Sequence, residues 1–480
     1  MQISNVKLDE IANAEYTRYA VAVNEDRSVP SCLDGLKPVS RRGIWTLYQL
    51  KAFSNSPHEK SARFVGHTLG YFHPHGDVSC YESYATMVNS IFPLVDGDGS
   101  WGNLSDPQPA AMRYTQMRMS QFSELVYFNK FYIPAIQYVQ NYDGSQQEPL
   151  ILPALLPVLL LNGTFGVGVG VTAKIPSFSL ASLIPVLKKT FKTGKCTPYD
   201  CMGLKYTRLY GGELASTKES LKSFYEKGTG SVRFISSGEL DEEKKTLLIT
   251  KFAFNSSLEP YLKKTLELPF VTSVNDVSDV NKNNLVSPRV LVKFNSKSLS
   301  ELREHSRKIL ETVFGVAQSF DIRVVERYVS PRGEGAAHLG STNIPGVIET
   351  WCKFRVDLEK RACTYWIGEN KKEIENTELL MTAVKFRRVI IDALDKPFND
   401  AQLAEHLSKA LKLTIEQANY ILDLKIRRLK SLEMKDLIKK KSDLENERKD
   451  LISRYKNPIP HIYANMDSIL ASVTKRLPKV

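Results

Sequence analysis

The chain has 480 residues, of which 42% are hydrophobic and 25% are charged. These fractions are typical of globular proteins and exclude a disordered tail or a fibre, and the length predicts roughly two to four domains. The 65 Lys and Arg residues exceed the 53 Asp and Glu residues, which gives a net charge of +12. A basic excess of this size makes a polyanion the first partner to consider.

The first elements predicted along the chain are helical. Spaced apolar residues predict a helical arm over residues 1–25, and an irregular, proline-bearing segment follows to residue 40. Three short helices are then expected, at 41–51, 60–69 and 77–90. The last two are separated by a turn rich in helix breakers, and this spacing is typical of a helix-turn-helix unit.

An uncharged stretch spans residues 149–173 and could pass for a membrane segment. Its three prolines and four glycines would break a lipid-exposed helix, so a buried strand-and-turn segment is expected instead. The start of the sequence lacks the pattern of a signal peptide, and the six scattered cysteines form no CxxC pair. We therefore expect a cytoplasmic protein with reduced thiols and no membrane segment.

Residues 205–330 predict an α+β region. Alternating or apolar runs predict strands, and helical patterns lie between and after them. The strands are expected at 231–235, 245–250 and 290–294, and the helices at 216–227, 258–266 and 298–313.

From Asn343 onward the pattern is almost entirely helical. Leu437, Leu444 and Leu451 fall seven residues apart, which predicts a coiled coil that encloses a helical block around 375–431. The charge run at 439–441 is expected to be a solvated face of that coil.

A basic cluster lies between residues 27 and 63, where seven Lys and Arg residues accompany two acidic ones and give a local charge of +5. Prolines and a glycine fix the backbone of its first half, so its cations are expected to hold set positions. Fixed cations beside a helix-turn-helix unit suit contacts with nucleic-acid phosphates. A generic basic surface is the alternative.

The turn His73-Pro-His75-Gly-Asp77 contains two histidines that look like half of a metal site. A catalytic zinc needs a third protein ligand, and no HExxH motif is present. Turn and capping chemistry, with Asp77 as N-cap, and a phosphate contact are the other two interpretations. The sequence leaves all three open.

Arg113 and Tyr114 follow the glycine-rich loop 95–102. A tyrosine is ordinarily a core or interface residue. A phenolate that attacks phosphorus, however, needs a nearby cation to favour its ionisation and to hold the developing charge. Neither this loop nor the glycine-rich segment 162–170 has the pattern of a calcium or nucleotide-binding loop.

Five segments, taken together, resemble one protein family. The motifs RxxPxxxDGLKPVxRR, KSAR…HPHGD, VDGxGxxG, AAxRYT and LLPxLLxNGxxGIxxG are matched at 27–42, 60–77, 95–102, 110–115 and 155–170. In order and spacing they resemble the DNA-breakage subunit of type IIA topoisomerases, as in the gyrase and topoisomerase IV A subunits. The resemblance is strong over about residues 25–180 and weaker to about residue 455.

The resemblance implies roles for individual residues. Tyr114 matches the nucleophile that forms a 5′-phosphotyrosyl link, Arg113 its neighbouring cation, and Arg27 a basic residue near the scissile phosphate. Val167 matches the apolar residue that wedges between base pairs and bends the DNA. Further DNA contacts are implied for Lys37, Arg41, Arg42, Lys60, Arg63, His73 and His75.

An α+β multidomain fold is implied as well. Its expected parts are a helical arm (1–25), a winged-helix domain with the catalytic tyrosine (26–155), an α/β tower domain (156–335), a long coiled coil with a helical C-terminal dimer gate (336–460, gate about 375–431) and a tail (461–480).

The implied partners are double-stranded DNA, a second copy of the chain bound through the gate, and a B-type subunit. That subunit is expected to hold ATP and Mg²⁺, because the ATPase domain and the acidic metal-binding domain are missing here. No metal site is expected in this chain. Short A-type subunits of this kind resemble those of large tailed phages, for which the compartment is the host cytoplasm.

Two other functions remain. A non-catalytic winged-helix DNA-binding protein would explain the basic cluster but not the Arg113–Tyr114 pair. A metallohydrolase at His73 and His75 would act as a nuclease by itself.

Overall fold

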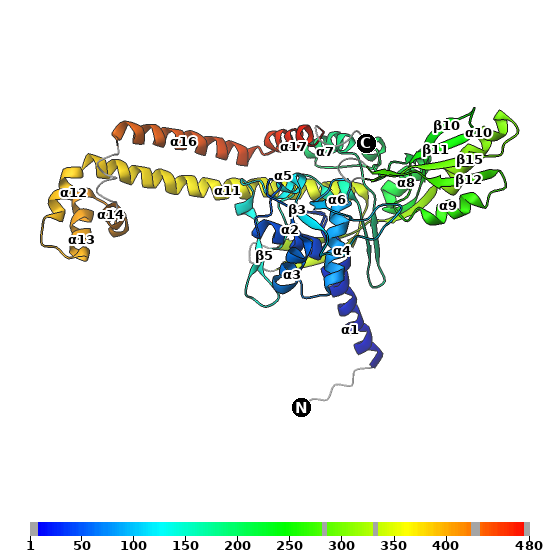
Figure 1. The fold of residues 1–480 in the computed structure, drawn as a ribbon. Helices are drawn as coiled ribbons and strands as arrows, with labels where there is room; N and C mark the ends of the chain where they lie inside the picture. Colours follow the sequence, from blue (N-terminus) through cyan, green and yellow to red (C-terminus); the bar gives the residue numbers. More distant parts are fainter. Residues whose placement is uncertain (1–7, 281–285, 330–334, 424–432, 475–480) are drawn as a thin grey trace. The chain divides into compact units, whose positions relative to one another are not determined.

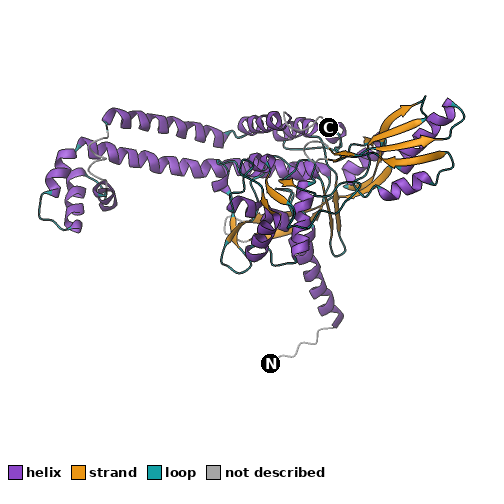
Figure 2. Ribbon diagram, in the orientation of Figure 1, coloured by secondary structure: helices purple, strands orange, loops and turns teal. Residues whose placement is uncertain are grey.

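The computed structural model describes residues 8–280, 286–329, 335–423 and 433–474 (Figure 1). The chain has a mixed α/β fold and divides into two compact units (Figure 2). The first unit contains residues 1–355 and 462–480, and the second contains residues 356–461. Part of the predicted gate, residues 424–431, lies outside the described residues.

The predicted N-terminal helices are confirmed from residue 8 onward, and residues 1–7 of the predicted arm lie outside the described residues. The helices are α1 (Leu8–Val23), α2 (Pro38–Gln49), α3 (Ser61–Tyr71) and α4 (Asp77–Val88), with the short π-helix η1 (Asn24–Ser28) after α1. Helix α2 begins three residues earlier than predicted, because Pro38 is well suited to the first turn of a helix. The N-cap of α4 is Gly76, so Asp77 is an acidic residue of the first turn and not the cap itself.

A small antiparallel sheet lies next to these helices. Its strands are β1 (Glu59–Lys60), β2 (Val95–Asp98) and β3 (Gln116–Met119), in the order β1-β3-β2. Lys60 pairs with Gln116, so the segment that begins α3 lies beside the chain that follows Tyr114. The remaining elements of this region are α5 (Gln121–Tyr127), η2 (Ile133–Ala135), β4 (Tyr138–Gln140) and β5 (Gln147–Pro149).

The uncharged stretch 149–173 is largely buried up to residue 161, but its middle is a short helix, α6 (Val158–Asn162), and not a strand. Leu160 and Leu161 are fully buried. A hairpin of β6 (Thr164–Val167) and β7 (Thr172–Ile175) follows, as the glycines of this segment suggest. Of the helices in the described ranges, none combines the length and the apolar character that crossing a membrane requires.

Two larger sheets and two separate strand pairs, β13-β14 and β17-β18, lie in the rest of the first unit. One of the larger sheets has the strand order β6-β7-β16-β9-β8 and the other β10-β11-β15-β12. The second of these sheets packs against helices around a core that includes Ile249, Phe252, Val292 and Phe314. The strands are β8 (Glu213–Leu214), β9 (Thr229–Ile235), β10 (Ser237–Asp241), β11 (Thr246–Lys251), β12 (Val271–Asp276), β13 (Asp279–Val280), β14 (Val286–Ser287), β15 (Val290–Phe294), β16 (Val316–Asp321), β17 (Arg323–Val329) and β18 (Gly335–Ser341).

The helices of this region confirm the predicted α+β pattern. The three predicted helices correspond to α8, α9 and α10, the last of which continues into the π-helix η4. The helices are α7 (Leu180–Thr193), η3 (Asp200–Gly203), α8 (Lys218–Lys227), α9 (Glu259–Leu266), α10 (Leu299–Lys308) and η4 (Ile309–Val313).

The second unit is helical, as predicted. Helix α11 (Ile344–Lys385) extends into it from the first unit and lies beside α16 (Met434–Lys456) (Figure 1). Between them come α12 (Arg387–Leu394), α13 (Asp400–Leu411) and α14 (Ile415–Leu422). On α16, Leu437 and Leu451 are buried and Leu444 is half-buried, which is the predicted seven-residue seam.

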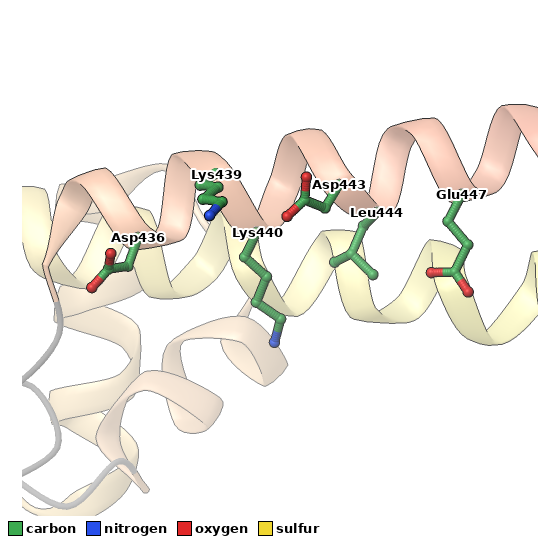
Figure 3. Close-up of a pocket in the computed structure, with 6 residues that line it drawn as sticks. All are labelled: Asp436, Lys439, Lys440, Asp443, Leu444 and Glu447. Carbon is green, nitrogen blue, oxygen red and sulfur yellow. The ribbon is translucent and has the colours of Figure 1, made fainter.

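The charge run at 439–441 is only in part the solvated face that we expected. Lys440 forms an ion pair with Glu373, and Lys441 forms one with Glu378 at 2.7 Å, so both contact α11. Figure 3 shows the residues that line a hollow along α16, among which Lys440 and Leu444 point toward α11. The run therefore helps to join the two helices.

The segment expected to be a tail from residue 461 contains a helix instead, α17 (Ile459–Thr474). Ile462 and Met466 are fully buried. Lys188 of α7 forms an ion pair with Asp467 at 2.8 Å, and the Tyr463 hydroxyl donates to the Lys188 carbonyl oxygen at 2.7 Å. The buried residues recur every three or four positions, a helical signal that the sequence already contained.

Candidate functional site

Tyr114 is exposed, with 66% of its surface accessible. The guanidinium carbon of the exposed Arg113 lies 4.6 Å from the centre of the Tyr114 ring. The Tyr114 amide donates to the Ala111 carbonyl oxygen at 2.8 Å and thereby closes a tight turn. A phenol and a cation are thus presented together to solvent, as the sequence led us to expect.

The neighbours of Tyr114 hold this loop firmly. Thr115 is fully buried, and its hydroxyl lies 2.8 Å from both the Ser61 and the Tyr81 hydroxyls. The Tyr81 hydroxyl also contacts the Ala110 carbonyl oxygen at 2.6 Å, and the Ser61 amide donates to the Thr115 carbonyl oxygen at 3.1 Å. Sequence reasoning missed Ser61 and Tyr81 as supports of the tyrosine, although Ser61 is part of the KSAR segment.

Arg41 is not available for a phosphate contact, which corrects our expectation. Its guanidinium is buried and binds both carboxylate oxygens of Asp34, at 2.5 and 2.9 Å, together with the Leu36 carbonyl oxygen at 3.1 Å. Asp34 is fully buried and also accepts the Leu152 amide at 3.0 Å. The pair satisfies itself internally and holds the 34–36 turn against the start of α2.

Arg42 is also paired, but it remains partly exposed. Its guanidinium binds Glu148 through two hydrogen bonds of 2.8 Å, and its Nη1 lies 3.0 Å from Nδ1 of His73. Arginine can only donate, so Nδ1 of His73 accepts and the ring proton sits on Nε2. Arg42 thereby fixes the tautomer of His73.

His73 is a neutral donor at physiological pH. Burial, followed by the charges of His75, Arg42 and Arg27, lowers the pKa of His73 to about 4. The ring stacks on His75, which is exposed, with centroids 4.2 Å apart. Because a cation already occupies Nδ1, a metal ion at that nitrogen is disfavoured. Within the described ranges no group of three or more His, Cys, Asp or Glu side chains is placed to hold a metal ion.

The hairpin β6–β7 is attached to the basic cluster. The Lys37 ammonium donates to the Phe165 carbonyl oxygen at 2.7 Å, and burial lowers the pKa of this lysine. Asn24 clamps the tip, since its amide group donates to the Val169 carbonyl oxygen at 3.1 Å and accepts the Val169 amide at 3.0 Å. A Cβ on Gly168 would overlap the Asn24 side chain, which explains a glycine at that position. Sequence reasoning missed Asn24.

Val167 stands at the tip of this supported hairpin. Its surface is 64% exposed, as is 60% of that of Phe165 on the same strand. An exposed aliphatic side chain on a fixed hairpin is suited to insertion into a stack of bases.

Lys60 and Arg63 lie beside the tyrosine loop, at the junction of β1 and α3. Both are exposed, and Arg63 forms an ion pair with Glu59. Lys60 is therefore the more accessible of the two cations.

A cleft of about 600 Å³ collects several of the remaining cations. Arg27 and Lys37 line it together with His73 and His75, whereas its lining does not include Arg113 or Tyr114. The cleft continues to Arg208 and Gln318, which sequence reasoning did not identify. The chemistry-bearing residues of one chain therefore form two groups, the tyrosine loop and the cleft.

Comparisons with known proteins identify the family of this chain. The model of the family of DNA gyrase/topoisomerase IV A subunits matches residues 27–465. The chain is 31% identical over 457 residues to the A subunit of DNA topoisomerase 4 from Escherichia coli K12, which covers 92% of this chain and 58% of that protein. It is 28% identical over 452 residues to the A subunit of DNA gyrase from Thermotoga maritima, covering 91% of this chain and 54% of that protein. The chain spans little more than half the length of these relatives, and on the family match it belongs to the family of DNA gyrase/topoisomerase IV A subunits.

Proposed function

We propose that the chain is the DNA-breakage and rejoining subunit of an ATP-dependent type IIA topoisomerase. Tyr114 is the proposed nucleophile. The observation that carries the proposal is an exposed tyrosine with a guanidinium against its ring, on a loop whose neighbouring residues are buried and hydrogen-bonded.

In the proposed reaction the Tyr114 phenol loses its proton, and its oxygen attacks a DNA phosphorus. A 5′-phosphotyrosyl bond forms, the bond from phosphorus to the 3′ oxygen breaks, and that oxygen leaves as a hydroxyl after taking up a proton. Arg113 stabilises the negative charge that develops. The phenolate is a good leaving group because the ordinary pKa of tyrosine is about 10, so the reverse reaction reseals the strand without ATP.

The cleft supplies the proposed positioning of the DNA. Arg27 and Lys37 contact phosphates, and His73 offers its Nε2 proton, whose position Arg42 fixes. Lys60, Arg63 and His75 are exposed and complete the proposed set, from which Arg41 is omitted because it is buried against Asp34. Val167 is proposed to enter the base stack, where the cost of unstacking is about a few kcal/mol and is offset by contacts that the bend allows.

The finer fold assignments are also proposals. The α3–turn–α4 unit with the sheet β1-β3-β2 supports a winged-helix domain over 26–155. The two larger sheets support a tower domain over 156–335, and the α11–α16 pair supports a coiled coil over 336–460. We propose that the helical block near 375–431 is the gate through which two copies of the chain dimerise.

We further propose that a B-type subunit supplies the ATP and Mg²⁺ sites and that the complex acts in the cytoplasm. We propose no residue of this chain as a ligand of ATP or Mg²⁺. The non-catalytic DNA-binding alternative predicts binding without any covalent product. The metallohydrolase alternative predicts metal-dependent cleavage by this chain alone.

A phosphotyrosyl trap tests the proposal. The chain is incubated with its B-type partner and DNA, denatured, and examined for protein bound covalently to DNA. Wild type is expected to give the covalent complex and Tyr114→Phe none, with DNA affinity nearly unchanged because phosphate contacts supply most of it. Tyr142→Phe, at another exposed tyrosine, is the matched control and is expected to behave as wild type. Covalent complex in the Tyr114→Phe protein would reject the assignment.

A further inference from the structure

Arg208 lies on the wall of the cleft that Arg27 and Lys37 also line, in the connection between η3 and β8. Its guanidinium stacks over the Phe234 ring, 4.5 Å from the ring centre, and its Nη1 donates to Gln318 Oε1 at 2.7 Å. Its Nε is buried and has no hydrogen-bond partner among the described residues. Among the residues that the structure describes, no carboxylate forms an ion pair with it.

The backbone around Arg208 is held on both sides. The Thr207 amide donates to the Ser177 carbonyl oxygen at 3.0 Å, and the Ser177 hydroxyl donates to the Thr207 carbonyl oxygen at 2.6 Å. Beyond Arg208, the Tyr210 carbonyl oxygen accepts the Phe252 amide at 2.8 Å. Because this segment is already held in place, binding of a ligand to the guanidinium costs little conformational entropy.

A cation in this environment favours an anion from outside the chain. Burial lowers the pKa of Arg208 to about 10, so the side chain is still charged at neutral pH. A buried charge is normally paired. Arg41 and Arg42 have Asp34 and Glu148, whereas within the described residues Arg208 contacts the neutral amide of Gln318 and the Phe234 ring but no carboxylate.

We propose that Arg208, held by Gln318 and Phe234, binds a backbone phosphate of the DNA and so extends the interface beyond the residues that the sequence motifs identify. The proposal rests on the proposed function. DNA is the occupant that the cleft favours, because the same cleft contains Arg27, Lys37 and the exposed Phe165 of the wedge hairpin. A planar guanidinium suits a phosphate, to which it can donate two hydrogen bonds.

The first test removes the charge. DNA affinity of the full chain is measured by fluorescence anisotropy with a labelled duplex over a series of salt concentrations. Arg208→Met is expected to bind about tenfold more weakly, with a salt dependence that is shallower by about one counterion. The control is Arg233→Met. Arg233 is exposed, donates to the Glu311 carbonyl oxygen and precedes Phe234 on β9, so it points to the other face of the sheet.

The second test neutralises Arg208 without removing it. Gln318→Glu puts a carboxylate where the amide oxygen now lies 2.7 Å from Arg208, and it is expected to weaken DNA binding as much as Arg208→Met does while leaving the midpoint of thermal unfolding equal or higher. Ala317→Glu adds the same charge to the opposite, exposed face of β16 and is expected to have a much smaller effect. If Arg208→Met does not fold, the comparison of Gln318→Glu with Ala317→Glu still tests whether Arg208 contacts DNA.

The proposal is overturned if Arg208→Met binds like Arg233→Met, or if Gln318→Glu binds like Ala317→Glu. Absence of any DNA binding by the wild-type chain would overturn both this proposal and the proposed function. Loss of affinity at Arg208 in a protein that forms no covalent complex would support the DNA contact and reject only the cleavage chemistry.

Discussion

Two regions of the first unit use their charged and polar groups in opposite ways. In the basic segment 27–42, Arg41 and Arg42 are paired with Asp34 and Glu148. In the loop around Tyr114, neighbouring residues make the buried hydrogen bonds, while Arg113 and Tyr114 remain exposed. Charge density in a sequence therefore does not measure how much charge is available to a ligand. Availability depends on which carboxylates the fold brings alongside, and those lie up to about a hundred residues away in the chain.

The largest effect is expected at the buried Arg41–Asp34 pair. Arg41→Met leaves the Asp34 carboxylate buried without its cation, and we expect the free energy of unfolding to fall by about 3–5 kcal/mol. Chemical denaturation measures this change. Arg233→Met, at an exposed arginine, should change stability by no more than about 0.5 kcal/mol. A loss at Arg41 as small as that of the control would mean that the pair is not structural.

The lowered pKa of His73 predicts that stability depends on pH. The pKa of His73 is about 4 in the folded chain against an ordinary value of 6.5, so the unfolded chain takes up the proton first as the pH falls. The stability that neutral His73 contributes is complete above about pH 6.5 and is lost between about pH 6.5 and 4. Over this pH range we expect the contribution of His73 to the free energy of unfolding to fall by about 1–3 kcal/mol, after allowance for solvent screening.

Denaturation at pH 7 and pH 5 measures this contribution. His73→Gln keeps an acceptor for Arg42 but does not titrate, so its stability should fall less than that of wild type between the two pH values. His461→Gln, at an exposed histidine, controls for the loss of one imidazole. The same fall in wild type and His73→Gln would contradict the neutral, buried state of His73.

A smaller effect is expected in the tyrosine loop. Tyr81→Phe removes the hydroxyl that contacts Thr115 and Ala110 but keeps the ring, and one such hydrogen bond contributes about 1 kcal/mol. We expect the rate of covalent complex formation at saturating DNA to fall about fivefold, with unchanged DNA affinity. Tyr84→Phe, at a buried tyrosine that contacts Thr68 and Gly43 instead, should lower stability without a specific loss of cleavage rate. Equal rates for Tyr81→Phe and wild type would remove Tyr81 as a positioning residue.

A small change in DNA affinity is also expected at the wedge residue Val167. Val167→Ala shortens the exposed side chain of a hairpin that Lys37 and Asn24 support. DNA affinity should change by less than about threefold, because phosphate contacts dominate it, but the bend of the bound duplex should decrease. Energy transfer between dyes at the two ends of the duplex reports the bend. Thr172→Ala, at the residue that pairs with Val167, is the control. The same bend in Val167→Ala and wild type would exclude the wedge.

Much of the fold could be predicted because its signals are local. The helices around His73 and the strands near Phe234 and Val292 follow from spacing and breakers, and they lie within a few residues of the predicted limits. The short helix at Leu159 could not be separated from a strand, since a continuous apolar run has no period that distinguishes the two. Helix α17 had a usable period, with Ile462 and Met466 four residues apart, and was missed.

The candidate site was predictable in its residue types but not in its partners. Tyr114 and Arg113 are adjacent in sequence, so their association needed no knowledge of the fold. The pairing of Arg42 with Glu148 and the contact of Arg208 with Gln318 join segments that are distant in the chain, and no local pattern encodes them.

The most direct test of the central claim is to identify the residue that becomes joined to DNA. The covalent complex formed in the presence of the B-type partner is digested with protease and nuclease, and the modified peptide is sequenced by mass spectrometry. We expect a single modified residue, Tyr114, joined through its phenolic oxygen to a 5′ phosphate. A nucleotide on any other residue, or cleaved DNA without any protein adduct, would contradict it.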